Sequence, residues 1–332
     1  MTETLPALPA GLILRAPAAQ DAEALLALVH AYDVAMIGHP DFTLEDVHDE
    51  LSDNRVDLAR GSWVVADADG ALLGWAYVVE QGVEADGTLA LDGDVTVHPD
   101  VADALGPVLV ARVVARVGEV AAERGAASGR VDCFLVSTDQ RGARWREAAG
   151  FACVRRFSRL ETALPAEVAF PPLPAGVTIR GIDGVQDWPL VHRLLYATFA
   201  GHFGIVTEPY ETWAERMSSA NTTDTTQWFV ARLDGEPAGL VMGAEQWVEA
   251  NGGWVKNLGV MPAYRGRGLG RLLLRHAMAD MARRGRTQVG LGVDTKNETG
   301  ALALYESLGF APVYAADVWR LVVPASERAG SA

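Results

Sequence analysis

The feature that most constrains this chain is an internal repeat with a period of roughly 160 residues. Each half opens with a short apolar run that ends near an arginine, Arg15 or Arg180, and continues into a segment with the apolar spacing of an amphipathic helix. Each half later contains a short helical segment that ends in Gly-Phe, at 150–151 and at 309–310. The repeat predicts two copies of one fold.

The order of segments within each half predicts an α/β fold with a mixed sheet. An Asp-Gly pair, at 69–70 and at 234–235, separates two β-rich runs and indicates a hairpin. A further strand ends in Val-x-Pro, at 97–99 and at 260–262, and a long helix, another strand and the short helix follow. Strands that alternate with helices in this way favour a sheet flanked by helices.

The segment 164–176 is rich in proline and poor in charge, and this composition indicates an extended linker. We therefore expect an N-terminal domain over 1–163, a linker over 164–176, a C-terminal domain over 177–324 and a flexible tail over 325–332. Each domain is long enough to bury a core of its own.

Composition excludes several functional classes. The 43 acidic and 28 basic residues give a formal charge of −15, which opposes binding of nucleic acid. Neither a membrane helix nor a secretory signal is recognisable, so we expect a cytoplasmic protein without a membrane partner. Cys133 and Cys153 do not form a zinc motif, the histidines are scattered, and we expect no metal site.

The strongest chemical motif is the run Arg265-Gly-Arg-Gly-Leu-Gly270, between the strand that ends at Pro262 and a helix. Glycines let the backbone approach a ligand closely, and the free N–H groups of a helix start attract anions. Three interpretations compete. The run is a tight turn only, a dinucleotide-binding fingerprint with Asp294 at the distance of a ribose ligand, or a loop that holds the pyrophosphate of coenzyme A.

The third interpretation agrees with a second motif. The pattern Arg265-x-x-Gly268-x-Gly270 resembles the coenzyme A loop of the GNAT superfamily of N-acetyltransferases. The later strand, Asn297 and the helix that carries Tyr305 and ends in Gly-Phe resemble the second signature of that family. The resemblance covers 177–322 and, more weakly, 12–162. It implies two tandem GNAT-like domains, each with a mostly antiparallel sheet and a splayed central pair of parallel strands.

The resemblance also implies roles for individual residues. Main chain at Leu258 and Val260 would bind the pantetheine arm, Gly259 would suit a bulge, and the amide of Leu258 or Gly259 would stabilise the oxyanion. Tyr305 would protonate the leaving thiolate, although a tyrosine at this place can also be a packing residue. Asn297 would contact the coenzyme or cap the helix that follows it. The implied coenzyme-binding set is Leu258, Gly259, Val260, Arg265, Gly266, Arg267, Gly268, Leu269, Gly270, Arg271, Asn297 and Tyr305.

The general base and the acceptor site are less defined by the sequence. Glu245 ends an apolar strand and is the first candidate base, with Glu208, His202, Asp294 and a chain of ordered water as alternatives. The aromatic-rich segment 199–217 would line the acceptor site, although aromatic packing alone would also explain its composition. The implied acceptor-binding residues are His202, Phe203, Glu208 and Trp213.

The first half lacks these chemical groups. The segment that matches the loop is Asp100–Pro107, with aspartates in place of arginine and a proline that removes an N–H group. Alignment on Gly-Phe places Arg146 opposite Tyr305 and Thr138 opposite Asn297. The first domain is therefore interpreted as degenerate; a coenzyme site with altered chemistry is the alternative.

The sequence thus predicts an acetyl-CoA-dependent N-acetyltransferase that acts on a primary amine of a small molecule, as a monomer or homodimer. A non-catalytic protein that binds or senses acyl-CoA is the alternative from another class. A dinucleotide-dependent oxidoreductase is the third hypothesis, and it would bind NAD(H) instead.

Overall fold

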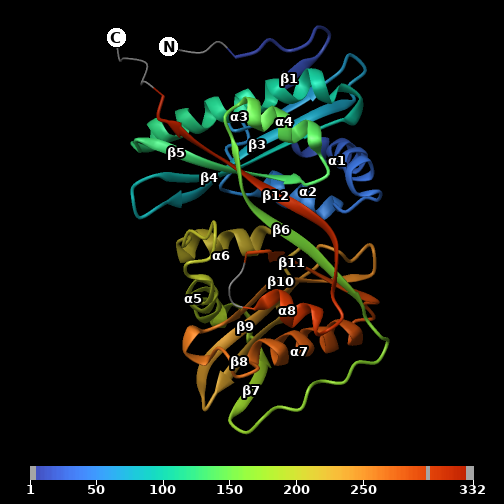
Figure 1. Ribbon diagram of the computed structural model, residues 1–332, viewed down its shortest axis with the longest axis vertical. Helices are drawn as coiled ribbons and strands as arrows, with labels where there is room; N and C mark the ends of the chain where they lie inside the picture. Colours follow the sequence, from blue (N-terminus) through green and yellow to red (C-terminus); the bar gives the residue numbers. More distant parts are fainter. Residues whose placement is uncertain (1–4, 297–299, 327–332) are drawn as a thin grey trace. The chain divides into compact units, whose positions relative to one another are not determined.

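The computed structural model describes residues 5–296 and 300–326, and the chain divides into two compact units (Figure 1). The N-terminal unit comprises Met1–Arg156 and Ala315–Ala332, and the C-terminal unit comprises Phe157–Tyr314. The chain therefore enters the C-terminal unit once and returns to the N-terminal unit at its end. Among the described residues, no helix is both long and apolar enough to span a membrane.

The N-terminal unit contains strands in the order β1-β2-β3-β4-β5-β12, antiparallel except for β4 and β5. Its strands are β1 (Ile13–Arg15), β2 (Ser62–Ala66), β3 (Leu72–Val83), β4 (Leu89–Val97), β5 (Ser128–Val136) and β12 (Ala311–Pro324). Its helices are α1 (Ala22–Ile37), α2 (Leu44–Ser52), α3 (Ala102–Arg124) and α4 (Gln140–Ala148), with short 3-10 turns at Ala19–Asp21 and Pro99–Val101.

The C-terminal unit repeats this plan with strands in the order β6-β11-β10-β9-β8-β7, again with one parallel pair, β10 and β11. Its strands are β6 (Ala152–Ala163), β7 (Val177–Gly181), β8 (Trp228–Leu233), β9 (Glu236–Ala244), β10 (Gly252–Val260) and β11 (Gln288–Asp294). Its helices are α5 (Trp188–Phe199), α6 (Tyr210–Ser219), α7 (Leu269–Arg283) and α8 (Ala301–Glu306), with 3-10 turns at Gly184–Asp187, Thr225–Gln227 and Pro262–Tyr264.

The two units exchange their last strands. In the C-terminal unit β6 pairs with β11, with Leu160 opposite Leu291, and in the N-terminal unit β12 pairs with β5, with Val318 opposite Phe134. The sequence-based boundaries kept each last strand with its own half. Both strands follow the same Gly-Phe signature after the short helix, so the repeat alone does not distinguish the two pairings.

The segment 164–176 also differs from its expected place. It begins against the C-terminal unit, where the Leu164 amide donates to the Thr287 carbonyl at 2.8 Å. Farther along, the ring of Phe170 packs on that of His276, in α7, with 4.6 Å between the centroids. The segment therefore runs along the C-terminal unit, and the passages between units lie within β6 and at β12.

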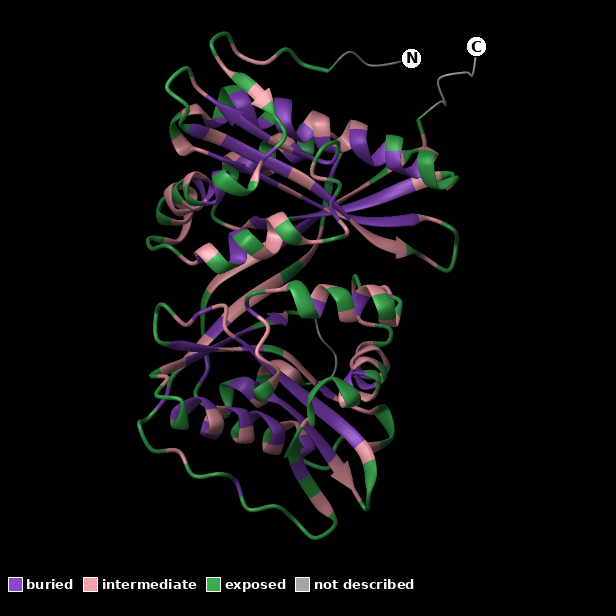
Figure 2. Ribbon diagram, turned by 180° about the vertical axis from the view of Figure 1, so that it is seen from behind, coloured by how far each residue is buried: buried purple, intermediate pink, exposed green. Residues whose placement is uncertain are grey.

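In each unit the helices pack on the strands through two separate clusters of buried residues (Figure 2). In the N-terminal unit one cluster contains α3 and the other contains α1 and α2. In the C-terminal unit the corresponding clusters contain α7 on one side and α5 and α6 on the other. The prediction of a mixed α/β fold is confirmed.

Both parallel pairs end early, so the strands splay. The register of β10 with β11 ends at Val255 opposite Leu291, although β10 continues to Val260. The register of β4 with β5 ends at Gly93 opposite Cys133, although β4 continues to Val97. In each unit the end of the first parallel strand therefore has one edge without a strand partner among the described residues.

Candidate active site

The free edge of β10 presents main-chain groups at Leu258 and Val260. The Met261 amide donates to the Ala238 carbonyl of β9 at 2.9 Å, and the register continues with Val260 opposite Gly239. Hydrogen-bonded and non-hydrogen-bonded pairs alternate along antiparallel strands, so Gly259 bonds to β9 whereas Leu258 and Val260 direct their N–H and C=O groups away from it. These two residues therefore present polar groups on the side where β10 leaves β11.

The bulge in β10 lies before Gly259, the residue at which the sequence suggested it. The register with β9 shifts between Val255 and Asn257, which places the extra residue at Lys256. Gly259 instead packs closely against α5, because a Cβ there would lie 2.2 Å from the hydroxyl oxygen of Thr198. The glycine is thus required by packing, and the bulge coincides with the point where the strands part.

The glycine-rich loop is open at its surface. Gly266 and Gly268 have φ values of +74° and +79°, which favour glycine, and a Cβ at either would meet no described atom within 4 Å. Gly268 is the N-cap of α7, and within the described chain no side chain caps this helix. Leu269 is 2% exposed and fixes the first turn in the core. The first amides of α7 are consequently available to an anion.

The three arginines of the loop do different things. Arg265 donates from Nε to the Val260 carbonyl at 3.1 Å and from Nη2 to the Thr198 carbonyl at 2.9 Å, so it ties the loop to β10 and α5. Arg267 is exposed, with its guanidinium 5.8 Å from the centroid of the Tyr264 ring. Arg271 donates to the Ser307 hydroxyl at 2.6 Å and so links α7 to the segment after α8. Arg267 alone extends from the loop without a hydrogen bond to the described protein.

Tyr305 lies near the end of α8, where its ring packs beside Phe310 with 6.0 Å between centroids. The residue is 8% exposed, and burial raises the pKa of its phenol to about 12. A phenol with this pKa is protonated at neutral pH and can donate a proton or hydrogen bond. Asn297, its companion in the second motif, lies outside the described residues.

The candidate base Glu245, which directly follows β9, has partners on both carboxylate oxygens. Its Oε1 accepts from Gln227 and its Oε2 accepts from Arg286 at 2.8 Å. Asp294 ends β11, where its Oδ1 accepts from the Lys296 amide at 2.9 Å.

Glu208 is also held by protein groups. The buried carboxylate accepts from Arg216 Nη2 at 2.5 Å and from the Tyr196 hydroxyl at 3.3 Å, and these contacts join α5, α6 and the loop between them. Burial, followed by the charge of Glu208, raises the pKa of Tyr196 to about 12. This network could not be predicted from the sequence, because its members lie on two helices and the loop between them.

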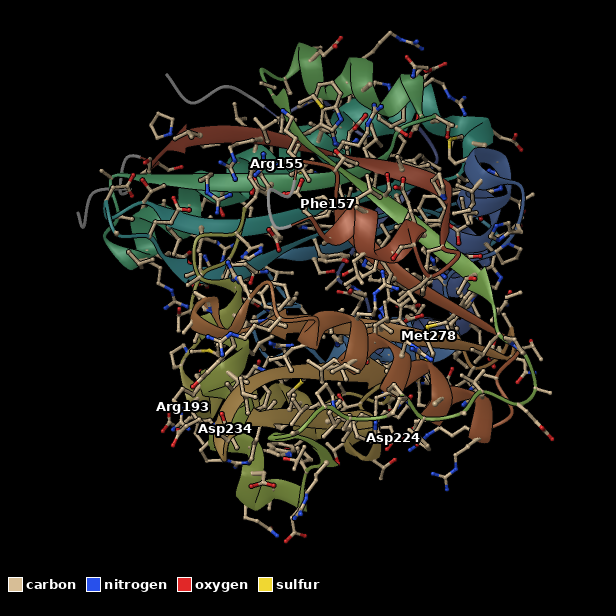
Figure 3. All side chains as sticks on the ribbon, turned by 60° about the horizontal axis from the view of Figure 1, so that its bottom comes forward. Arg155, Phe157, Arg193, Asp224, Asp234 and Met278 are labelled. Carbon is tan, nitrogen blue, oxygen red and sulfur yellow. The ribbon has the colours of Figure 1, made fainter. Side chains whose placement is uncertain are left out.

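The other residues expected at the acceptor site fall into two groups. Trp213 is 1% exposed and packs between Trp188 and Trp228, so it is a core residue that shapes the region from within. His202 and Phe203 are partly exposed in the loop after α5. The Phe203 ring lies 6.5 Å from that of Phe157, which Figure 3 labels on β6.

A cation–aromatic stack that sequence reasoning missed lies on the same sheet. The guanidinium of Arg159, on β6, is 4.6 Å from the Trp247 ring and 4.2 Å from the Trp254 ring. Trp254 is on β10 directly before the splay, opposite Gly290 of β11. The strand exchange brings Arg159 here, so no pattern within the second half could have indicated it.

In the N-terminal unit most of the segment that matches the loop is helical, because α3 begins at Ala102. A Cβ on Gly106, in the first turns of α3, would lie 2.3 Å from the Trp145 ring. Arg141 Nη1 donates to the Pro99 carbonyl at 3.0 Å, which closes the turn before the helix from another side. The residue after Trp145, Arg146, is 1% exposed. Alignment on Val-x-Pro places Asp103 and the buried Leu105 of α3 opposite the open Gly266 and Gly268, and Gly106 opposite the buried Leu269.

Splayed parallel strands followed by an open glycine-rich helix start define a class of acyl-CoA-dependent acyltransferases, and comparisons agree. The Acetyltransferase (GNAT) family profile matches residues 188–310. The mycothiol acetyltransferase of Beutenbergia cavernae is 30% identical over 269 residues, which cover 75% of this chain and 80% of that protein. The mycothiol acetyltransferase of Renibacterium salmoninarum is 29% identical over 291 residues, or 82% and 80% of the two chains.

Solved structures extend the similarity over nearly the whole chain. A GCN5-related N-acetyltransferase from Sphaerobacter thermophilus superposes with a TM-score of 0.76 at 26% identity, covering 96% of this chain and 98% of that one. A tandem GNAT protein from the clavulanic acid biosynthesis pathway shares the fold, with a TM-score of 0.71, 16% identity and coverage of 95% and 100%. The chain belongs to the GNAT family of acetyltransferases. It is an N-acetyltransferase of the tandem type, and this family uses acetyl-CoA.

Proposed function

We propose that the C-terminal unit transfers the acetyl group of acetyl-CoA directly to a primary amine of a small molecule. The observation that supports this most is the alignment of three features in one unit. The main-chain groups of Leu258 and Val260 that face away from β9, the open loop at Gly266 and Gly268 and the protonated phenol of Tyr305 all belong to this unit. Tyr305 is part of the hydrophobic cluster on which Leu258 and Val260 pack.

The coenzyme would be held by main chain. Leu258 and Val260 offer polar groups to the pantetheine amides, and the amides of Gly266 to Gly270 offer donors to the pyrophosphate. The carbonyl of Val260 already accepts from Arg265, so the N–H group of Val260 and both groups of Leu258 are the most available. Arg265 thereby acts on the loop's position, and Arg267 is the side chain best placed to reach a phosphate.

The chemistry would proceed by attack of the neutral amine on the thioester carbonyl. Of the two amides considered for the oxyanion, Leu258 is favoured, because the alternation along β10 commits Gly259 to β9. Tyr305 would then give its proton to the departing thiolate as general acid. A thiol has a pKa of about 8.5, so this proton is helpful without being indispensable.

An alkylammonium has a pKa of about 10, so the amine must lose a proton before it attacks. Both Glu245 and Glu208 are engaged by arginines, and a base role would require one oxygen to be released. These contacts favour a chain of ordered water as the route of this proton. Asp294 and His202 remain the side-chain alternatives.

The names of the relatives suggest the first acceptor to test. Similarity to mycothiol acetyltransferases over most of the chain supports a mycothiol precursor as a candidate. The identity to these relatives is only 29–30%, and Trp254 of this chain stacks on Arg159 directly before the splay. We therefore test a broad set of amines beside that candidate.

A thiol-release assay with acetyl-CoA tests the proposal. A mycothiol precursor and a panel of small primary amines would be supplied to the full chain, and free coenzyme A would be measured. Amine-dependent release that Tyr305→Phe slows, together with an acetylated product by mass spectrometry, is the expected result. Tight acetyl-CoA binding without turnover across the panel would instead favour the sensor hypothesis.

A further inference from the structure

An exposed glycine lies in the C-terminal unit at the point where the parallel strands part. Gly292 is the first residue of β11 after the register with β10 ends at Leu291. Leu291 and Val293 are buried in the cluster that contains α7, so Gly292 between them faces the side on which α5 and α6 pack. It is exposed, and a Cβ there would meet no described atom within 4 Å. The strand is therefore open to solvent over Gly292, beside the splay.

Aromatic rings border this open position toward both ends of β11. Two residues before it, on the same face, a Cβ on Gly290 would lie 3.1 Å from the rings of Trp247 and Trp254. Two residues after it, the end of β11 is opposite Phe157 of β6, whose ring lies 6.5 Å from that of Phe203. Residues two apart on a strand are separated by about 7 Å, and Trp254, Phe157 and Phe203 are all partly exposed. Aromatic surface is thus accessible on both sides of the open position.

The third border is Arg159 of β6, which is directly opposite Gly292. Its Nε donates to Oε1 of Glu161 at 3.0 Å, and its guanidinium packs on the rings of Trp254 and Trp247. The positive charge is therefore balanced by a neighbouring carboxylate and covered by indole rings. A polar ligand group that loses water here without gaining a partner would bind poorly. The open position consequently suits an uncharged apolar group better than a carboxylate or a sugar.

The splay determines which end of a ligand over Gly292 would react. In the acetyl transfer proposed above, the thioester lies where β10 has left β11, beyond Val255 and Leu291, with the main chain of Leu258 beside it. Gly292 directly borders that gap. An amine that attacks the thioester from the side of α5 and α6 would therefore carry its other atoms across Gly292, between the two groups of aromatic rings.

We propose, on the basis of that acetyl transfer, that the acceptor is an arylalkylamine, a primary amine joined by a short alkyl chain to an aromatic ring. The ring lies over Gly292 between Trp254 and Phe157, and the amine reaches the thioester at the splay. Aromatic side chains attract a further ring through offset or edge-to-face contacts. Phe157 and Arg159 both come from β6, so the exchanged strand takes part in selecting the acceptor.

Steady-state thiol release at saturating acetyl-CoA tests this class of acceptor. The probes are 2-phenylethylamine, propylamine, which lacks the ring, phenylalanine, which adds a carboxylate, and glucosamine, whose ring is polar. We expect kcat/KM for 2-phenylethylamine to exceed that of each of the other three by at least about tenfold. A smaller ratio for any of them, or faster turnover of a mycothiol precursor, would overturn this inference and leave the acetyl transfer itself supported.

A binding measurement separates failure of this inference from failure of the proposed function. The full chain is saturated with coenzyme A and titrated calorimetrically with 2-phenylethylamine and with propylamine. If no amine is turned over, the acetyl transfer is refuted, yet binding of 2-phenylethylamine at least about tenfold tighter than that of propylamine would still support a ring-selective amine site. Equal binding of the two amines, or binding of neither, would refute the site as well.

Variants locate the ring. Gly292 has no positive φ, so Gly292→Leu fills the open position without straining the backbone. The ratio of kcat/KM for 2-phenylethylamine to that for propylamine should fall at least about tenfold, mainly through KM, while acetyl-CoA affinity stays intact and shows that the chain is folded.

Gly181→Leu is the matched control, because Gly181 is an exposed glycine on the edge strand β7, and it should leave the ratio unchanged. Phe157→Leu removes one bordering ring without filling the space and should also lower the ratio. It serves if Gly292→Leu fails to fold. An unchanged ratio in the folded variant would place the ring elsewhere and refute the inference.

Discussion

The two units differ most where the first parallel strand meets the following helix. At the start of α7, Gly266 and Gly268 leave open space, whereas at the start of α3 the Trp145 ring lies directly over Gly106. Both units keep the splay and both keep the helix. The difference teaches that this fold survives loss of its glycine-rich loop when the matching segment is helical instead.

Charge separates the two helix starts as well. The loop before α7 carries Arg265 and Arg267, whereas Asp100 and Asp103 stand at the start of α3. Acidic residues stabilise a helix start through its dipole by about 0.3–1 kcal/mol each. At the start of α3 the negative charge therefore comes from the protein's own aspartates. At the start of α7 we expect it to come from the pyrophosphate of the coenzyme.

The first way to break this comparison is to make the open loop acidic. We expect the parent chain to bind one acetyl-CoA and Gly268→Asp to lose at least about 100-fold in affinity, since the new carboxylate repels the pyrophosphate at close range. Calorimetric titration measures both stoichiometry and affinity. Gly285→Asp is the matched control, because Gly285 has a φ of +81° and open space and lies beyond the end of α7. Two sites in the parent, or equal effects of both variants, would contradict the comparison.

The second test concerns the tyrosine that the N-terminal unit lacks. Tyr305→Phe keeps the ring beside Phe310 and removes only the hydroxyl. General acid catalysis is worth about 10²–10⁴-fold, and a thiolate leaves fairly well unaided, so we expect kcat to fall by roughly 100-fold with little change in acetyl-CoA affinity. Single-turnover kinetics isolates the chemical step. A parent-like rate would make Tyr305 a packing residue.

The sequence predicted the parts of the fold that depend on local pattern. The repeat, the hairpins at the Asp-Gly pairs and the strand before the glycine-rich loop all depend on neighbouring residues, and the structure contains them. The glycine-rich loop could be predicted for the same reason. Positive φ at Gly266 and Gly268 is a property of those residues, so their spacing already indicated an open helix start.

What the sequence did not predict depends on residues that are distant along the chain. The exchange of β6 and β12 is a choice between two similar strands, and the sequence of either half is compatible with both. Glu245 meets Arg286, and Arg265 meets the Thr198 carbonyl, only after the sheet has formed. The side chain of Trp213 was expected at the acceptor and lies in the core, because an aromatic residue on a helix has the same pattern in either role.

A third test compares the two glycines at the helix starts. Gly106→Ala places a methyl group into the Trp145 ring and should lower the free energy of unfolding by about 1–3 kcal/mol. Gly270→Ala meets Leu304 at an ordinary 3.5 Å and should leave stability within about 0.5 kcal/mol or raise it. Urea denaturation of both variants gives the values. Similar losses at both positions would show that the Trp145 ring does not restrict the space at Gly106.

The smallest expected effect concerns two glutamates that the units treat differently. Glu208 is held by Arg216, whereas Glu50 hydrogen-bonds to Tyr77, and burial raises the pKa of Glu50 to about 7. Because this folded-state pKa lies above the unfolded value of about 4.3, the native state holds the proton more tightly, and stability falls as the pH rises from about 4 to about 7. Nearby charges reinforce or oppose this shift, with Asp94 and Asp53 raising the pKa and Arg55 lowering it.

Glu50→Gln removes the titration, so its stability relative to the parent should increase by on the order of 1 kcal/mol between pH 5 and pH 8. Glu208→Gln, which breaks an ion pair, should destabilise the chain at both pH values. Melting temperatures of the three proteins are measured from pH 5 to pH 8. A constant difference in melting temperature between Glu50→Gln and the parent would show that Glu50 does not titrate in this range.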